Sequence, residues 1–122
     1  EFRRVLFRSS LSKHYQLGIV SNFSGNLKII LDSFSLLPHL KFVLDSFHTG
    51  FCKPDISLFK MAIHECQTFP ENIFFVGDNP FRDIAPAKSL GMHTILLTSQ
   101  NNSTSDANYT ISSLIELSNL LL

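Results

Sequence analysis

The segment NIFFVGDNPFRD, from Asn72 to Asp83, constrains the fold of this chain more than any other. Its run of four apolar residues is typical of a parallel strand that is buried on both faces. Gly77 then lets the backbone leave the sheet sharply, so Asp78 is placed at the carboxyl end of the strand. Pro86 is tolerated only in the first turn of a helix, and we therefore expect a helix that begins near Asp83, with Asp83 as its N-cap. The alternative interpretation of the segment is a capped turn without chemical function.

Apolar runs of this kind alternate with amphipathic segments along the rest of the sequence. Strands are predicted over residues 16–20, 40–44, 73–76, 94–97 and 107–111. Helices are predicted over residues 26–37 and 84–90, after the N-cap Asp55, and after a capping box formed by Ser113 and Glu116. Residues 45–53 and 100–108 are expected to be loops. The alternation predicts an α/β fold with a parallel sheet and right-handed crossovers.

The composition restricts the class of protein further. With 122 residues, of which 44% are hydrophobic and 16% charged, the chain is long enough for one domain with a real core. No apolar stretch approaches the ~20 residues of a membrane span, and no signal peptide is recognisable, so no membrane partner is expected. Cys52 and Cys66 lack the spacing of a metal site and are expected to be two reduced thiols, which favours a cytoplasmic location.

The first nine residues, EFRRVLFRS, match codon for codon the translation of a common sequencing-library adapter. We therefore interpret residues 1–9 as an adapter-derived artefact and residues 10–122 as the natural part of the chain. That part has seven basic and nine acidic residues, a net charge of −2, and Arg82 is its only arginine. A basic surface for nucleic acid is therefore not expected.

Polar residues follow three of the predicted elements. Ser21 and Asn22 end the first strand, Lys53 precedes Pro54, and the two acids Asp78 and Asp83 follow the central apolar run. Because the carboxyl ends of parallel strands share one edge of a sheet, these side chains are expected to face one crevice. Taken singly, each has another explanation: a turn hydroxyl for Ser21, a solvated amine for Lys53, and a cap and a turn acid for the two aspartates.

This ordered set resembles the haloacid dehalogenase (HAD) superfamily of phosphohydrolases, from Leu17 to the end of the chain. Ser21 matches the second motif of that superfamily, Lys53 in GFCKPD the third, and Asp78 and Asp83 in VGDNPFRD the fourth. The segments DIAPAKSLGMHTILL and NYTISSLIEL are also similar to its C-terminal half. The resemblance implies a three-layer, Rossmann-like core with a parallel sheet.

The resemblance also implies a role for each polar residue. Members of the superfamily attack phosphorus with an aspartate of the first motif, and water then hydrolyses the aspartyl-phosphate. Lys53 would neutralise the nucleophile and the phosphoryl oxygens, while Ser21 and the backbone N–H of Asn22 would bind the transferred group. The implied substrate is a small phosphorylated metabolite.

The implied cofactor is Mg²⁺, with Asp78 as a ligand and Asp83 as a residue that holds a metal-bound water or orients its neighbours. Asn79 would orient the loop between them. Arg82 is expected to form a surface ion pair rather than to contact substrate. The five histidines lack the spacing of metal ligands, although His48 lies in the same loop as Lys53.

One part of the superfamily pattern has no counterpart in this sequence. No Asp-x-Asp pair occurs in the chain, so the nucleophile and its acid–base partner are absent. The central first strand and any cap inserted after it would be missing as well, and we expect an inactive, marginally stable fragment with unpaired strand edges beside Ser21 and Asp78. The alternatives are a haloacid dehalogenase-type hydrolase and a non-catalytic module that binds phosphate and Mg²⁺. The sequence selects neither a substrate nor an oligomeric state.

Overall fold

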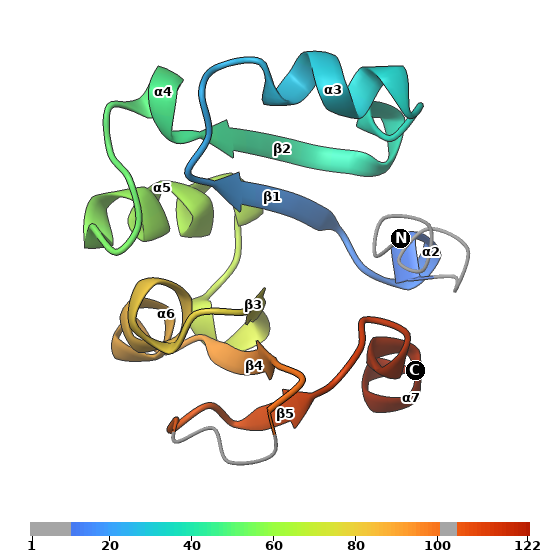
Figure 1. The fold of residues 1–122 in the computed structure, drawn as a ribbon, viewed down its shortest axis with the longest axis vertical. Helices are drawn as coiled ribbons and strands as arrows, with labels where there is room; N and C mark the ends of the chain where they lie inside the picture. The colour runs from blue at the N-terminus through green and yellow to red at the C-terminus, as the bar shows by residue number, and fades with distance from the viewer. Residues whose placement is uncertain (1–10, 101–104) are drawn as a thin grey trace.

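The structure is a computed structural model that describes residues 11–100 and 105–122. Its first part contains the elements α2 (Leu11–His14), β1 (Leu17–Ser21), α3 (Leu27–Ser33), η1 (Leu37–His39), β2 (Leu40–Asp45), α4 (Ser46–Thr49) and α5 (Ile56–Cys66). Its second part contains η2 (Pro70–Asn72), β3 (Phe74–Gly77), η3 (Pro80–Ile84), α6 (Ala85–Ser89), β4 (His93–Leu97), β5 (Tyr109–Ile111) and α7 (Glu116–Leu121). Strands and helices alternate as predicted up to β4, whereas β5 follows β4 with no helix between them in the described residues (Figure 1).

All strand pairs in the described residues are parallel, which confirms the predicted α/β class. The strands form two sheets: β1 pairs with β2, and β3, β4 and β5 pair in that order. Ser21 at the end of β1 lies opposite Asp45 at the end of β2, and Phe74 at the start of β3 lies opposite His93. Within the described residues, β1 and β3 are each paired on one side only, so the predicted unpaired edges are present.

Helices cover both faces of the sheets and give the three layers expected of the fold. On one face, α3 packs Leu27 and Leu31 against Ile19 of β1 and Val43 of β2. On the same side of the second sheet, α2 and α7 bury Leu11 and Leu117 against Ile95. The opposite face is covered by α5 and α6, whose residues Phe59 and Ala87 pack with Phe75 of β3. The adjacent residues Phe75 and Val76 thus pack against opposite helical layers, because successive side chains of a strand point to opposite faces of the sheet.

The helix predicted over residues 26–37 is shorter in the structure. α3 ends at Ser33, and Ser35 adopts a left-handed conformation with φ 58°. The backbone N–H of Leu36 donates to the carbonyl oxygen of Leu31, and that of Ser35 donates to Asp32. This closure satisfies the last carbonyl groups of the helix before Pro38 is reached, so Pro38 lies in a separate turn, η1.

The loop predicted over residues 45–53 contains a short helix, α4. Its N-cap is Asp45, whose carboxylate accepts a hydrogen bond from the backbone N–H of Phe47. Gly50 ends this helix in a left-handed conformation with φ 80°. The predicted loop over residues 100–108 falls partly outside the described residues, and the last strand is confined to Tyr109–Ile111.

Two further expectations concern the cysteines and the membrane. Cys52 and Cys66 are both free thiols. In the described part of the chain, no helix is long and apolar enough to span a bilayer. Burial raises the pKa of the Cys66 thiol, which Glu65 also raises and Lys41 lowers. Cys66 is therefore held in its neutral form within the apolar side of α5, as expected for a packing residue.

Candidate functional site

The carboxyl ends of β1, β2 and β3 meet around an ion pair between Lys53 and Asp83. Lys53 follows α4 and the nitrogen Nζ lies 2.7 Å from Oδ1 of Asp83, in the turn after β3. The side chains of Lys53 and Asp83 are only 17% and 4% exposed. Because both charges are largely removed from water, their attraction is screened less by solvent and salt than that of a surface ion pair. Lys53 is therefore not the solvated surface amine of the alternative interpretation.

The backbone of Lys53 is fixed by Asn22, which follows β1. Oδ1 of Asn22 accepts a hydrogen bond of 2.7 Å from the N–H of Lys53, and Nδ2 of Asn22 donates to the Lys53 carbonyl oxygen at 3.1 Å. The peptide bond between Lys53 and Pro54 is cis. The two loops that the sequence placed at one edge are thus joined by a reciprocal pair of hydrogen bonds. This function of the Asn22 side chain was not predicted, since the resemblance assigned only its backbone N–H.

Asp83 reaches the ion pair because Gly77 has no side chain. A Cβ atom on Gly77 would lie 2.3 Å from Cβ of Asp83 and 2.6 Å from its Oδ2, well inside any real contact. The same Oδ2 accepts a hydrogen bond from the backbone N–H of Asn79 at 3.1 Å. Asp83 therefore connects two segments: its Oδ1 pairs with Lys53, and its Oδ2 accepts the hydrogen bond from Asn79 in the turn after β3.

The predicted cap of the following helix is wrong. Asn79, not Asp83, is the N-cap, because its Oδ1 accepts hydrogen bonds from the backbone N–H groups of both Phe81 and Arg82. The turn from Pro80 to Ile84 is a π-helix that continues into α6. Asp83 lies inside this turn and is buried, so its carboxylate is used in the site rather than at a helix end. The proposed orienting role of Asn79 agrees with this arrangement.

Sequence reasoning missed a second buried acid, Asp45, at the end of β2. Oδ2 of Asp45 accepts a hydrogen bond of 2.9 Å from the N–H of Gly25, and Oδ1 accepts one of 3.0 Å from Phe47. Nε2 of His48 contacts the Gly25 carbonyl oxygen at 2.9 Å. The loop after β1 is therefore held from two sides by α4. The signal was present in the sequence, because Asp45 follows an apolar strand as Asp78 does.

Asp78 is exposed at the end of β3 and, among the described residues, its carboxylate has no hydrogen-bond or ion-pair partner. It is thus the free acid of the site. The described residues contain no group of three or more histidine, cysteine or acidic side chains that could hold a metal by themselves. Mg²⁺ is commonly held by one or two carboxylates together with water and substrate phosphate oxygens, and Asp78 fits the part of one such ligand.

The other candidates lie at the margin of this site. Ser21 is half-buried at the last position of β1 and points to no side-chain partner within the described residues. Arg82 is exposed, and the ion pair expected for it is not formed with any described acid. Ser21, Asn22, Lys53, Asp78 and Asp83 are accordingly found at one edge, of which Asn22, Lys53 and Asp83 are directly connected.

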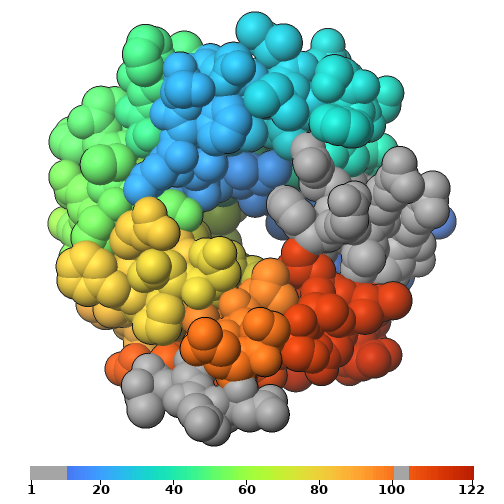
Figure 2. All heavy atoms as spheres, viewed as in Figure 1, coloured from blue at the N-terminus to red at the C-terminus, as the bar shows by residue number. Residues whose placement is uncertain are grey.

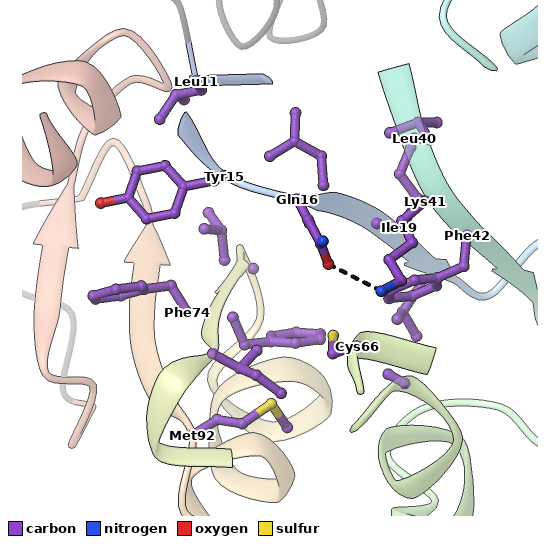
Figure 3. A pocket seen from close by; sticks show the side chains of 18 of the residues that line it. Leu11, Tyr15, Gln16, Ile19, Leu40, Lys41, Phe42, Cys66, Phe74 and Met92 are labelled. Atoms are coloured by element: carbon purple, nitrogen blue, oxygen red, sulfur yellow. Dashed lines mark hydrogen bonds between the residues drawn. The ribbon is translucent and has the colours of Figure 1, made fainter. Parts of the chain in front are cut away.

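A cavity of about 880 Å³ leads from this edge between the two sheets. Lys53, Asp78 and Asp83 line its polar end, and the rest of the lining comes largely from β1, β3 and the flanking helices. Figure 2 shows an opening through the molecule in this region, and Figure 3 shows the side chains around it. The polar site therefore continues into an apolar interior space.

Comparison with known proteins gives consistent matches. The sequence profile of haloacid dehalogenase-like hydrolases matches residues 7–97. The chain is 37% identical over 97 residues to haloacid dehalogenase-like hydrolase domain-containing protein 3 of Bos taurus, covering 80% of this chain and 39% of that protein. The chain thus spans about two fifths of the length of this relative.

Solved structures show the same fold. A HAD phosphatase of Thermococcus onnurineus superimposes with a TM-score of 0.81 and 26% identity, over 98% of this chain and 54% of the other. A HAD-hydrolase of Bacillus subtilis, solved bound to magnesium, also gives a TM-score of 0.81 at 26% identity, over 94% of this chain and 52% of the other. These matches extend across both sheets of the chain.

Proposed function

Because the chain belongs to the haloacid dehalogenase-like hydrolase family, we propose that the full-length protein hydrolyses a small phosphomonoester through an aspartyl-phosphate intermediate. The observation that carries this proposal is the buried Lys53–Asp83 ion pair, fixed by Asn22 at the carboxyl edge of the parallel strands. A rigid ammonium group at such an edge suits a doubly charged phosphoryl group better than a neutral substrate. The phosphatase from Thermococcus onnurineus, which has the same fold, supports this choice.

In this proposal, Lys53 donates to the phosphoryl oxygens and offsets the negative charge of the attacking carboxylate. Asp83 and Asn22 keep the Lys53 side chain and backbone in place, so little reorganisation is needed when the substrate binds. Ser21 and the backbone N–H of Asn22 donate hydrogen bonds to the transferred group from the β1 side. The phosphoryl group is thus bound from two strand ends.

Mg²⁺ is the proposed cofactor, and Asp78 is the residue that would hold it. Asp78 is the acid of the described site whose oxygens are free, while Asp83 already uses one oxygen for Lys53 and the other for Asn79. Bound there, the cation would offset the charge of the phosphoryl oxygens. The magnesium-bound Bacillus subtilis hydrolase supports the choice of metal. We further propose a cytoplasmic setting, in agreement with the two free thiols.

The 122-residue chain itself is proposed to bind phosphate without turning over a substrate. It contains no Asp-x-Asp pair and therefore offers no candidate for the nucleophile and its acid–base partner. The purified chain with Mg²⁺ is expected not to hydrolyse p-nitrophenyl phosphate. Hydrolysis that disappears in Asp78→Ala would overturn this part of the proposal.

A phosphate titration tests the binding site directly. Inorganic phosphate with Mg²⁺ is titrated into the chain and into the variants Lys53→Gln and Lys60→Gln, and binding is followed by calorimetry. Lys60 is an exposed lysine of α5 and serves as the matched control. Lys53→Gln is expected to weaken phosphate binding by roughly tenfold or more, as expected for a charge-assisted hydrogen bond, and Lys60→Gln is expected to leave it unchanged. Equal losses in both variants would contradict the proposal.

Activity assays on the full-length protein, run beside the phosphate titration, separate the remaining candidates. A phosphatase hydrolyses the phosphomonoester, a dehalogenase-type hydrolase releases halide from a 2-haloacid, and a non-catalytic module binds phosphate and does neither. Hydrolysis of the phosphomonoester that is lost in Lys53→Gln is the expected result.

A further inference from the structure

The short helix α4 holds the loop after β1 through polar side chains that bond to the loop backbone. Given the function proposed above, on which this role rests, we propose that Ser46 and His48 of α4 are positioning residues for the phosphate site. They fix the loop of residues 22–25 and, with it, the backbone N–H of Asn22 that binds the phosphoryl group. Neither side chain needs to touch the phosphoryl group for this role.

The side chains of α4 and of its N-cap satisfy both backbone groups of two loop residues, Phe23 and Gly25. The hydroxyl of Ser46 accepts a hydrogen bond from the N–H of Phe23 at 3.0 Å and donates one to the Phe23 carbonyl oxygen at 3.2 Å. The N–H of Gly25 donates to Oδ2 of Asp45 at 2.9 Å, and the Gly25 carbonyl oxygen lies 2.9 Å from Nε2 of His48. Because a carbonyl oxygen only accepts hydrogen bonds, Nε2 of His48 carries the proton in this contact.

These hydrogen bonds begin where the ladder between β1 and β2 ends. The last residues paired in that ladder are Ser21 and Asp45. Beyond them the backbone groups of the loop lose their ladder partners and need others, and loops that find none are the more mobile parts of a fold. Figure 1 shows α4 beside this loop, which leads from β1 to α3. The side chains of α4 therefore keep the loop on a fixed path after it has left the sheet.

Close packing between Phe47 and Gly25 reinforces the same contact. A Cβ atom on Gly25 would lie 2.7 Å from Cδ2 of the Phe47 ring, which is closer than real Cβ contacts. Gly25 also has a φ of 103°, a conformation that other residues rarely adopt. At this point α4 thus packs directly on the backbone of the loop, and a displacement of α4 would move the loop with it.

Asn22 is held on two sides as a result. Its side chain exchanges hydrogen bonds with the backbone of Lys53, and the peptide group that follows it is bonded to Ser46 through the N–H of Phe23. With the side chain and the following peptide group both fixed, the direction of the Asn22 N–H is fixed as well. A backbone donor that is already oriented stabilises a phosphoryl group more strongly, because it does not have to reorganise when the group binds.

Phosphate titrations of serine variants test this role. Inorganic phosphate with Mg²⁺ is titrated into the 122-residue chain and into Ser46→Ala, Ser46→Thr and Ser33→Ala, and binding is followed by calorimetry. Ser46→Ala is expected to weaken phosphate binding by about threefold to tenfold, the worth of one hydrogen bond, and Ser46→Thr, which keeps a hydroxyl, is expected to restore most of it. Ser33 is the matched control, because its exposed hydroxyl donates only to the Ile30 carbonyl oxygen of its own helix. Ser33→Ala should bind phosphate as the unsubstituted chain does.

A histidine pair and hydrogen exchange show whether the effect arises in the loop. His48→Ala is expected to weaken phosphate binding about threefold, whereas His64→Ala, at a side chain of α5 that is 89% exposed, should not change it. In Ser46→Ala and His48→Ala, the backbone amides of Phe23 and Gly25 are expected to exchange several-fold faster. Unchanged exchange in α5 would show that the rest of the chain stays folded.

The outcomes separate the positioning role from the function on which it rests. If the unsubstituted chain binds phosphate and Lys53→Gln weakens that binding, while Ser46→Ala and His48→Ala bind phosphate unchanged, the proposed function stands and the positioning role is wrong. Equal losses of affinity in Ser46→Ala and Ser46→Thr, or in Ser46→Ala and Ser33→Ala, would also overturn the positioning role, because the Ser46 hydroxyl would not be the cause. If the unsubstituted chain does not bind phosphate, both proposals are wrong.

Discussion

At the scale of single residues, the packing of Asp83 explains why position 77 requires glycine. A Cβ atom at this position would lie 2.3 Å from Cβ of Asp83, so any larger residue must displace the acid. Gly77→Ala is therefore expected to lower the free energy of unfolding by about 1–3 kcal/mol through overpacking. It should also weaken phosphate binding, because Asp83 can no longer hold Lys53. Chemical denaturation and the phosphate titration measure the two effects.

Gly50→Ala is the matched control for this prediction. A Cβ atom at Gly50 meets no atom within 4 Å, but its φ of 80° is unfavourable for alanine. The variant should therefore lose about 1 kcal/mol of stability from backbone strain alone and keep its phosphate affinity. Unchanged phosphate affinity in Gly77→Ala would contradict the close-packing argument.

The carboxyl group of Glu116 is expected to make the stability of the fold depend on pH. Its pKa is lowered first by the hydroxyl of Ser112 and then by the backbone N–H groups of Ser112 and Ser113. A pKa that is lower in the folded state stabilises the fold at pH values above the unfolded pKa, and this contribution is lost as the pH falls through the folded pKa. Ser112→Ala should raise the Glu116 pKa in an NMR titration, whereas Ser99→Ala should not. An identical titration in both variants would be evidence against these hydrogen bonds.

At the scale of elements, Asp45 connects the loop after β1 to α4. Its two carboxylate oxygens accept hydrogen bonds from different segments, so Asp45→Ala leaves the N–H groups of Gly25 and Phe47 without their partner. The expected loss of stability is about 1–3 kcal/mol. The exposed residue Asp32 provides the control, since Asp32→Ala should change the melting temperature little. Equal melting temperatures for the two variants would show that Asp45 does not hold the loop.

The elements also show where sequence patterns succeed and where they fail. Apolar runs located the bounds of the first four strands to within one residue, because burial on both faces leaves a continuous signal. The last strand, which is more exposed, begins two residues later than predicted. The ends of helices were less predictable. Asn79 rather than Asp83 became the cap of the turn after β3, because the backbone of Asn79 leaves the strand with its amide directed at two free N–H groups. Which of the two residues is the N-cap depends on the path of the backbone after β3, and the spacing of residues in the sequence does not reveal that path.

At the scale of the whole molecule, a cavity separates the two sheets. The described residues leave one edge of β1 and one edge of β3 unpaired, and Phe74 of β3 is 37% exposed. Both features favour association between chains. We expect light scattering of the purified chain to rise with concentration. Val20→Lys should reduce this association more than Ile29→Lys does, because Val20 lines the cavity between the two sheets and Ile29 does not. A soluble monomer that unfolds cooperatively at all concentrations would contradict the prediction.

The sequence by itself determined the parallel α/β order of the chain and the set of polar residues that gather at one edge. Apolar periodicity and strand-end residues are local properties, and the shared carboxyl edge of parallel strands brings Asn22, Lys53 and Asp83 together without further information. The predicted roles of Ser21 and Asp78 in phosphate and metal binding remain predictions.

Only the tertiary structure decided how the site is held and where the molecule is open. The contact of Gly77 with Asp83, the reciprocal hydrogen bonds of Asn22 and the burial of Asp45 each depend on segments that are distant in sequence. The cavity between β1 and β3 is likewise visible only in the tertiary structure, because residues of both sheets and of the flanking helices line it. Such contacts follow from the close approach of elements in space, which periodicity along the chain does not encode.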